Sequence, residues 1–155
     1  MTKSLQETHA PQGRCFGCGP ANDKGLRIRS FASGDVVKLD WTPEKHHEAF
    51  EGVLNGGIIG ALLDCHMNWT AIHHLMVKNG LEKAPCCVTA EFKVQLKRPT
   101  PIGPVHIEAK VLTSEEDRAT IEAVMTSPQA GGKVTAIGTG TFVAVKPDHP
   151  AYHRW

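Results

Sequence analysis

The chain has 155 residues, of which 41% are hydrophobic and 21% are charged, a composition typical of one globular domain. The formal net charge is +1 and the acidic and basic residues are interspersed, so nucleic-acid binding has no electrostatic support. No stretch approaches the roughly 20 apolar residues that cross a bilayer, and the first residues lack the apolar core of a secretory signal. We therefore expect a cytoplasmic protein that binds neither nucleic acid nor membrane.

The chain divides into three predicted segments. Residues 1–14 show no hydrophobic periodicity and are expected to form an N-terminal arm. Residues 147–155 begin at a proline and contain a second one, which indicates a C-terminal tail. Residues 15–146 form the predicted domain between these ends.

Cys15 and Cys18 form a CxxC pair at the start of the domain, which is half of a zinc site or half of a redox pair. The side chains that could complete such a site are His9, Cys65, His66, Cys86 and Cys87. None of them has a spacing that argues for a metal, and a reducing cytoplasm keeps cysteines as thiols. We therefore expect no metal here and interpret the segment as a glycine-bearing loop before the first strand.

The next predicted elements are a hairpin and a long helix. Apolar residues on both sides of Ser33-Gly34 favour two short paired strands. A helix is expected from about Gly57 to about Val77, where Asn79-Gly80 provides a C-terminal signal. Its apolar residues occupy most of the circumference, so we expect other elements to surround it.

Strict alternation of apolar and polar residues over 88–97 predicts a half-buried strand, and segments 105–111, 118–127 and 132–145 continue the pattern. Short breaker segments separate these strands, so we expect consecutive strands to pair antiparallel. One long helix lying along a curved antiparallel sheet of five or six strands is an α+β fold.

Asp64 lies inside the apolar run of the predicted helix. Helical spacing places it on a stripe of small or polar residues, namely Gly57, Gly60, Ala61, Asn68 and Ala71. A carboxylate partly removed from water must be paired or must titrate at a raised pKa, and such groups concentrate at functional sites. The stripe makes Gly57 and Asn68 candidates for substrate binding. The alternative is an Asp64 that faces a water-filled gap or bonds a neighbouring chain's backbone.

The predicted start of the same helix contains the triplet Asn55-Gly56-Gly57. Unpaired N–H groups at a helix N-terminus can bind a developing oxyanion, and glycine lets a carbonyl approach the backbone. The rise of roughly 10 Å over seven helical residues separates this triplet from Asp64. Both could act on one group only if the substrate lies along the helix or a second protomer completes the site.

Four stretches of the sequence together resemble the hotdog-fold thioesterases, and within them the phenylacetic-acid-degradation type that hydrolyses acyl-CoA thioesters. The stretches are CFGCGPANDKGL, FEGVLNGGIIGALLD, VTAEFKVQLKRPTPIG and GGKVTAIGTGTFVAV, and they cover about residues 15–145. The resemblance implies a hotdog domain over residues 15–146 and a homodimer with active sites at the subunit interface, whose pairing into a tetramer is left open. It also implies an acyl-CoA substrate and no cofactor other than the coenzyme A of that substrate.

The resemblance assigns roles to five residues. The family's His-Gly-Gly falls on Asn55, Gly56 and Gly57, its acidic residue on Asp64, and a hydroxyl residue on Thr89. By this likeness the Gly56 N–H binds the thioester oxygen. Asp64 of the partner subunit acts as general base or as nucleophile, and Thr89 orients the water or the carboxylate.

The chain departs from the family pattern at two positions. Asn55 replaces the usual His and can donate and accept hydrogen bonds but cannot carry a proton. Ala49 stands near a position where many members have Asn. His47 and Glu48 are close enough in sequence to supply polar contacts to a substrate. Arg98 is a candidate for binding the phosphates of coenzyme A. The alternative is that it is simply a solvated side chain at the end of a strand.

The leading functional prediction is hydrolysis of an acyl-CoA thioester to the free acid and coenzyme A. A non-catalytic hotdog dimer that binds an acyl-CoA is the first alternative, and Asn55 is the feature that favours it. A dehydratase or isomerase acting on thioesters is the second, although such an enzyme ordinarily has a His near the helix start.

Overall fold

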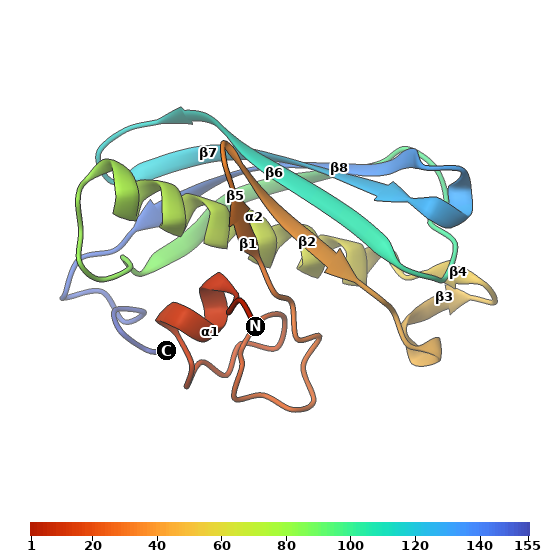
Figure 1. Ribbon diagram of the computed structural model, residues 1–155, viewed down its shortest axis with the longest axis horizontal. Helices are drawn as coiled ribbons and strands as arrows, with labels where there is room; N and C mark the ends of the chain where they lie inside the picture. The colour runs from red at the N-terminus through yellow and green to blue at the C-terminus, as the bar shows by residue number, and fades with distance from the viewer.

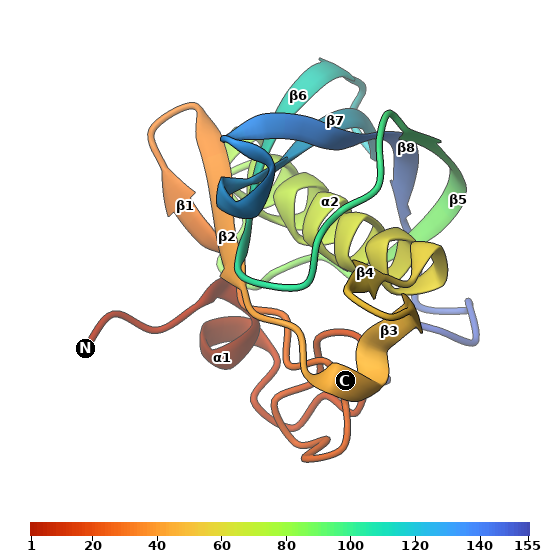
Figure 2. The ribbon, with the colours of Figure 1, turned by 90° about the vertical axis from the view of Figure 1, so that its right-hand side faces the viewer.

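A single long helix, α2 (Gly56–Lys78), is the central element of the fold. The computed structural model describes residues 1–155, and it places this helix along the concave face of a curved sheet (Figure 1). The view along the helix shows the strands wrapping around one side of it (Figure 2). Helix and sheet share one core in which Leu62, Leu63 and Met67 are fully buried. The predicted helix is therefore confirmed, with ends one residue beyond those expected.

The sheet has six strands in the order β1-β2-β6-β7-β8-β5, and all neighbours are antiparallel. Its strands are β1 (Phe31–Ser33), β2 (Val36–Trp41), β5 (Cys87–Leu96), β6 (Val105–Ser114), β7 (Arg118–Ser127) and β8 (Lys133–Ala144). The predicted hairpin at Ser33-Gly34 is present, with Gly34 in the left-handed region at φ +62°. This architecture confirms the α+β prediction.

One predicted pairing is wrong. Strand β5 does not pair with β6, its successor along the chain, but with β8. The connecting segment 97–104 contains three prolines and crosses the end of the sheet instead of forming a hairpin turn. It bonds to the segment before α2, where the Leu54 N–H donates to Thr100 O and Val53 bridges Pro101. Proline cannot continue a strand ladder, which explains why this connection leaves β5 at the edge of the sheet.

Three short elements complete the fold. The 3₁₀ helix η1 (Lys45–His47) and the hairpin of β3 (Glu48–Phe50) and β4 (Val53–Leu54) precede its N-terminus. The 3₁₀ helix η2 (Pro128–Ala130) connects β7 and β8. No helix is long and apolar enough to cross a membrane.

The N-terminal segment docks onto the helix through a chain of buried polar side chains. Helix α1 (Leu5–His9) brings Gln6 to Ser30, whose hydroxyl lies 2.8 Å from His66 Nδ1. His66 Nε2 donates to Val37 O at 2.9 Å, because a carbonyl can only accept. Burial lowers the pKa of His66 to about 4, so the ring is neutral and Nδ1 accepts from the Ser30 hydroxyl. This chain of bonds connects α1, the lead-in to β1, α2 and β2.

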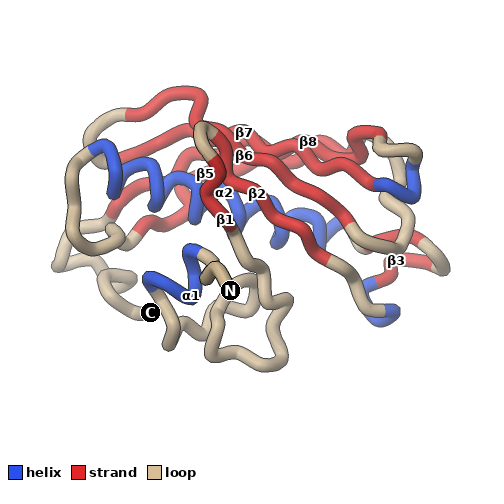
Figure 3. Tube along the Cα trace, viewed as in Figure 1, coloured by secondary structure: helices blue, strands red, loops and turns tan.

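Residues 10–30 follow α1 and contain neither helix nor strand. Figure 3 shows them as an irregular loop on the side of α2 that the sheet leaves open. The C-terminal residues reach the same side, where the Trp155 ring meets Trp69 edge-on at 5.3 Å. The open face of α2 is therefore covered by both ends of the chain.

Candidate functional site

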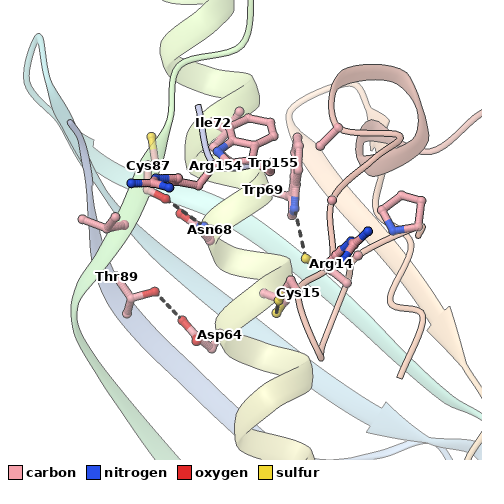
Figure 4. Close-up of a pocket in the computed structure, with 17 residues that line it drawn as sticks. Arg14, Cys15, Asp64, Asn68, Trp69, Ile72, Cys87, Thr89, Arg154 and Trp155 are labelled. Atoms are coloured by element: carbon pink, nitrogen blue, oxygen red, sulfur yellow. Dashed lines mark hydrogen bonds between the residues drawn. The ribbon is translucent and has the colours of Figure 1, made fainter. Parts of the chain in front are cut away.

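Asp64 is held by a hydrogen bond from the neighbouring layer. The Thr89 hydroxyl on β5 donates to Asp64 Oδ1 at 2.7 Å (Figure 4). Burial raises the pKa of the Asp64 carboxyl, and the bond from Thr89 opposes that shift. The two residues that the resemblance singled out on separate elements therefore meet in one chain.

The carboxylate faces a cavity of about 480 Å³ between α2, the start of β5 and the two chain ends. Its wall on the helix includes Asp64, Asn68 and Trp69, and its wall on β5 includes Thr89. A Cβ placed on Gly60, one turn before Asp64, would meet no atom within 4 Å. Gly60 of the predicted small-residue stripe thus borders open space, whereas Ala71 of the same stripe is fully buried.

Asn68 is the second polar side chain of this wall. Its Nδ2 donates to Cys87 O at 3.2 Å, while Oδ1 is buried and has no hydrogen-bond partner in the protein. A buried amide oxygen without a donor costs free energy, so it is a natural acceptor for a bound N–H group. We call Asp64, Asn68 and Thr89 the cavity half-site.

The start of α2 forms a separate arrangement, which we call the helix-start half-site: Asn55, Gly56 and Gly57. Asn55 is the N-cap, and its Oδ1 accepts from the Ile58 N–H at 3.1 Å. The N–H groups of Gly56 and Gly57 have no carbonyl one turn earlier to bond and no other partner in the protein. Asn55, at the position where the resemblance places a His, thus caps the helix and leaves two amide donors free.

His47 lies at the helix-start half-site through its backbone. Its carbonyl accepts from the Asn55 N–H at 2.9 Å, and its ring Nδ1 accepts from the Glu44 N–H at the same distance. Its ring contacts Trp41, and burial lowers its pKa, which favours the neutral form. The ring does not line the cavity at Asp64.

Arg98 follows β5 and is exposed, with Nη1 donating to Val134 O at 2.6 Å. The end of β5 lies beside the start of α2, because a Cβ on Gly56 would stand 3.3 Å from Leu96 Cδ1. Arg98 is therefore near the helix-start half-site in the fold and outside the wall of the cavity.

No protein-family model and no curated protein matches this sequence. Solved structures do match it. A thioesterase from Haemophilus influenzae is 16% identical with a TM-score of 0.70, and the match covers 96% of this chain and 97% of that one. Zebrafish thioesterase superfamily member 2 is 21% identical with a TM-score of 0.67, over 93% and 100% of the two chains. The PaaI protein of the Escherichia coli phenylacetic acid degradation operon is 16% identical with a TM-score of 0.64, over 82% and 88%.

The chain has the hotdog fold of these thioesterase-superfamily proteins. The fold predicted from the four sequence stretches is thereby confirmed, while the roles of individual residues stay predictions. Within one hotdog chain the two half-sites lie along the same helix, eight residues apart from Gly56 to Asp64. At about 1.5 Å per residue this is a separation of about 12 Å, too long for both to touch one carbonyl.

Several residues of the cavity carry no functional signal in the sequence. Trp69 and Trp155 narrow it from two different elements, and Arg154 lines it beside them. Cys15 and Cys65, which the sequence marked as possible metal ligands, also line it. Trp69 belongs to an apolar helix pattern and Trp155 to the C-terminal tail, so only their spatial meeting reveals them.

Asn55 provides a test of the helix-start geometry. Replacement by Ala removes the cap and should lower the free energy of unfolding by about 1 kcal/mol in urea denaturation. Replacement by Asp keeps a capping oxygen and should preserve stability, since a negative charge is favourable at a helix N-terminus. Equal losses in Asn55→Ala and Asn55→Asp would contradict the assigned cap.

Proposed function

We propose that this protein hydrolyses an acyl-CoA thioester to the free acid and coenzyme A. The observation that carries the proposal is the Asp64 carboxylate, held by Thr89 at 2.7 Å on the wall of a cavity inside a thioesterase-type fold. A carboxylate whose pKa is raised by burial is a stronger base than one in water. The neighbouring apolar walls suit an acyl group, and coenzyme A enters as part of the substrate.

The proposed chemistry uses both half-sites. Asp64 removes a proton from a water molecule, and the resulting hydroxide attacks the thioester carbon. The developing oxyanion is bound by the free N–H of Gly56, with Gly57 beside it and the positive end of the α2 dipole behind both. Collapse of the tetrahedral intermediate breaks the C–S bond, and the coenzyme A thiolate takes up the proton. Thr89 orients the carboxylate, and Asn68 Oδ1 accepts a hydrogen bond from a substrate N–H.

The separation of the half-sites favours a homodimer in which each site takes one half from each subunit. Strand β5 supports this arrangement because it is a sheet edge of ten residues, with one side paired to β8 and the other unpaired. Phe92 and Leu96 on this strand are 41% and 57% exposed. Long apolar edges are normally covered in proteins, and pairing of two β5 strands would cover them and join the sheets.

The phosphates of coenzyme A are assigned to the end of β5. Arg98 and its neighbour Lys97 are exposed there, close to the start of α2. Their charges can bind phosphate without entering the cavity, and a guanidinium binds it with two parallel hydrogen bonds. His47 lies at the same end of the helix and is proposed to contact the substrate through its free Nε2.

A second candidate function is an acyl-CoA-binding dimer without turnover. The observation that favours it is Asn55, whose Oδ1 caps the helix by accepting from the Ile58 N–H and whose amide, unlike a His ring, cannot carry a proton. Thermal stabilisation of the protein by an acyl-CoA, with no release of free thiol, would support this candidate over hydrolysis.

Substitution of Asp64 distinguishes thioester hydrolysis from acyl-CoA binding without turnover. Release of free coenzyme A should be measured across short, medium, long and aryl acyl-CoAs for the wild type, Asp64→Ala and Asp64→Asn. Loss of a general base should lower kcat by about 10²–10⁴ without loss of fold. Asp35→Asn, in the exposed β1–β2 turn, is the matched control and should keep full activity. Unchanged hydrolysis in both Asp64 variants would refute the mechanism.

The phosphate assignment is tested by the double substitution of Lys97 and Arg98 by Ala. The KM for an acyl-CoA should rise several-fold because phosphate contacts are lost, and the KM for the matching acyl-pantetheine should stay unchanged. Lys110→Ala, which removes an exposed cation on β6, serves as the control. Equal increases for both substrates would show that the two cations act on the fold and not on the phosphates.

A further inference from the structure

Three thiols meet at the junction between the N-terminal loop and α2. Cys15 and Cys18 come from the CxxC segment, and Cys65 comes from the helix, one residue after Asp64. The Sγ atoms of Cys15 and Cys65 lie 3.8 Å apart, and all three Sγ atoms lie within 4.8 Å of one another. All three cysteines are free thiols. No third ligand stands at a recognised spacing from the CxxC pair in the sequence. The fold supplies Cys65, which lies 47 residues after Cys18.

The spacing of the sulfur atoms fits a tetrahedral metal ion. Zinc binds thiolates at about 2.3 Å, which places two sulfur ligands about 3.8 Å from each other. The measured separation of Cys15 and Cys65 agrees with that value. Small adjustments of Cys18 within the loop would bring its sulfur to the same distance from the other two.

The loop is shaped to bring its sulfurs to the helix. A Cβ on Gly17 would overlap the Sγ of Cys65, so only glycine allows the loop to lie directly against that thiol. A Cβ on Gly19 would overlap the backbone at Cys15 and Gly13, and the Gly19 N–H donates to Cys15 O at 2.8 Å. These contacts close a tight turn around the CxxC pair.

Hydrogen bonds around the cluster favour negative charge on sulfur. The thiols of Cys15 and Cys65 lie within hydrogen-bond distance of each other, with 3.8 Å between their sulfur atoms. The indole N–H of Trp69 donates to Cys18 Sγ at 3.4 Å, a bond typical of the surroundings of metal-bound sulfur. A divalent cation would neutralise the cluster and displace the remaining thiol protons.

The chain around the cluster is a long irregular segment that a metal ion could hold against α2. Residues 10–30 form an irregular segment without helix or strand, and loops of that length are uncommon unless something organises them. Part of this segment, from Ala10 to Pro20, forms a wall of the cavity at Asp64. A metal ion between the loop and α2 would fix that wall in place.

We propose that Cys15, Cys18 and Cys65 bind one zinc ion that fastens the N-terminal loop to α2, with the fourth ligand position open to water from the cavity. Cys15 is exposed and lines the cavity, so solvent reaches this side of the cluster. The inference departs from the metal-free site expected from sequence, and it does not depend on thioesterase activity.

The test uses the full chain purified under reducing conditions, stripped with a chelator and titrated with Zn²⁺ or Co²⁺. The wild type should bind one ion per chain, with a thiolate-to-cobalt charge-transfer band and a rise in Tm on addition of zinc. Cys15→Ser and Cys65→Ser should bind at least about tenfold more weakly. Cys86→Ser, which changes a buried thiol outside the cluster, is the matched control and should bind as the wild type does.

Circular dichroism establishes that each variant is folded, and Cys15→Ser, at an exposed position, decides the result if Cys65→Ser does not fold. Lack of uptake by the reduced wild type, or equal uptake by Cys15→Ser, overturns the proposal. A disulfide within the cluster, with no metal uptake after its reduction, overturns it as well.

Discussion

The hydrogen bond from Thr89 to Asp64 is the contact on which the functional geometry depends. It joins α2 to the edge strand β5, with 2.7 Å between the two oxygen atoms. It also holds the Asp64 carboxylate at the wall of the cavity, whereas a carboxylate bonded only to water would be mobile. The sheet surrounds α2 on one side, and the two chain ends cover the other. The helix side that bears Asp64 and Asn68 is left with enough open volume for a ligand. Packing of the ends and placement of the acid are therefore linked.

A second constraint is the length of the helix. The free amides of Gly56 and Gly57 lie about 12 Å along the axis from Asp64, a distance fixed by the rise of an α-helix. Rearranging the side chains does not change this separation along the helix axis. An active site that uses both needs either a substrate that lies along the helix or one half-site from each of two chains, and the unpaired edge of β5 offers a surface on which two chains can meet. In the proposed mechanism, catalysis therefore depends on the assembly of two chains.

The sequence predicts those parts of the molecule that carry a periodic signal. The apolar circumference of α2 and the alternation along β5, β6, β7 and β8 locate these elements to within a few residues. Asp64 is recognisable because a carboxylate interrupts an apolar helix, and Thr89 because the resemblance assigns it a role. The hydrogen bond between Asp64 and Thr89 is visible only in the structure, because it depends on how β5 packs against α2.

Other features could not be predicted because they depend on contacts between distant segments. The pairing of β5 with β8 is settled by the crossing of segment 97–104, although short breakers had suggested a hairpin. The contact between the thiols of Cys15 and Cys65 joins residues 50 positions apart, for which the sequence offers no local spacing rule. The meeting of Trp69 and Trp155 depends on how the C-terminal tail docks. Each of these belongs to the wall or the surroundings of the cavity.

The most direct test of the shared site is complementation between two inactive variants. Gly56→Pro removes the amide donor at the first helical position, where proline is well tolerated, and Asp64→Asn removes the base from the other half-site. A mixed dimer contains one site with both groups intact, so random mixing should restore about a quarter of the wild-type rate of coenzyme A release. Each variant alone should stay inactive. Activity that does not return on mixing, from variants shown to be folded and to exchange subunits, would contradict an active site shared between two chains.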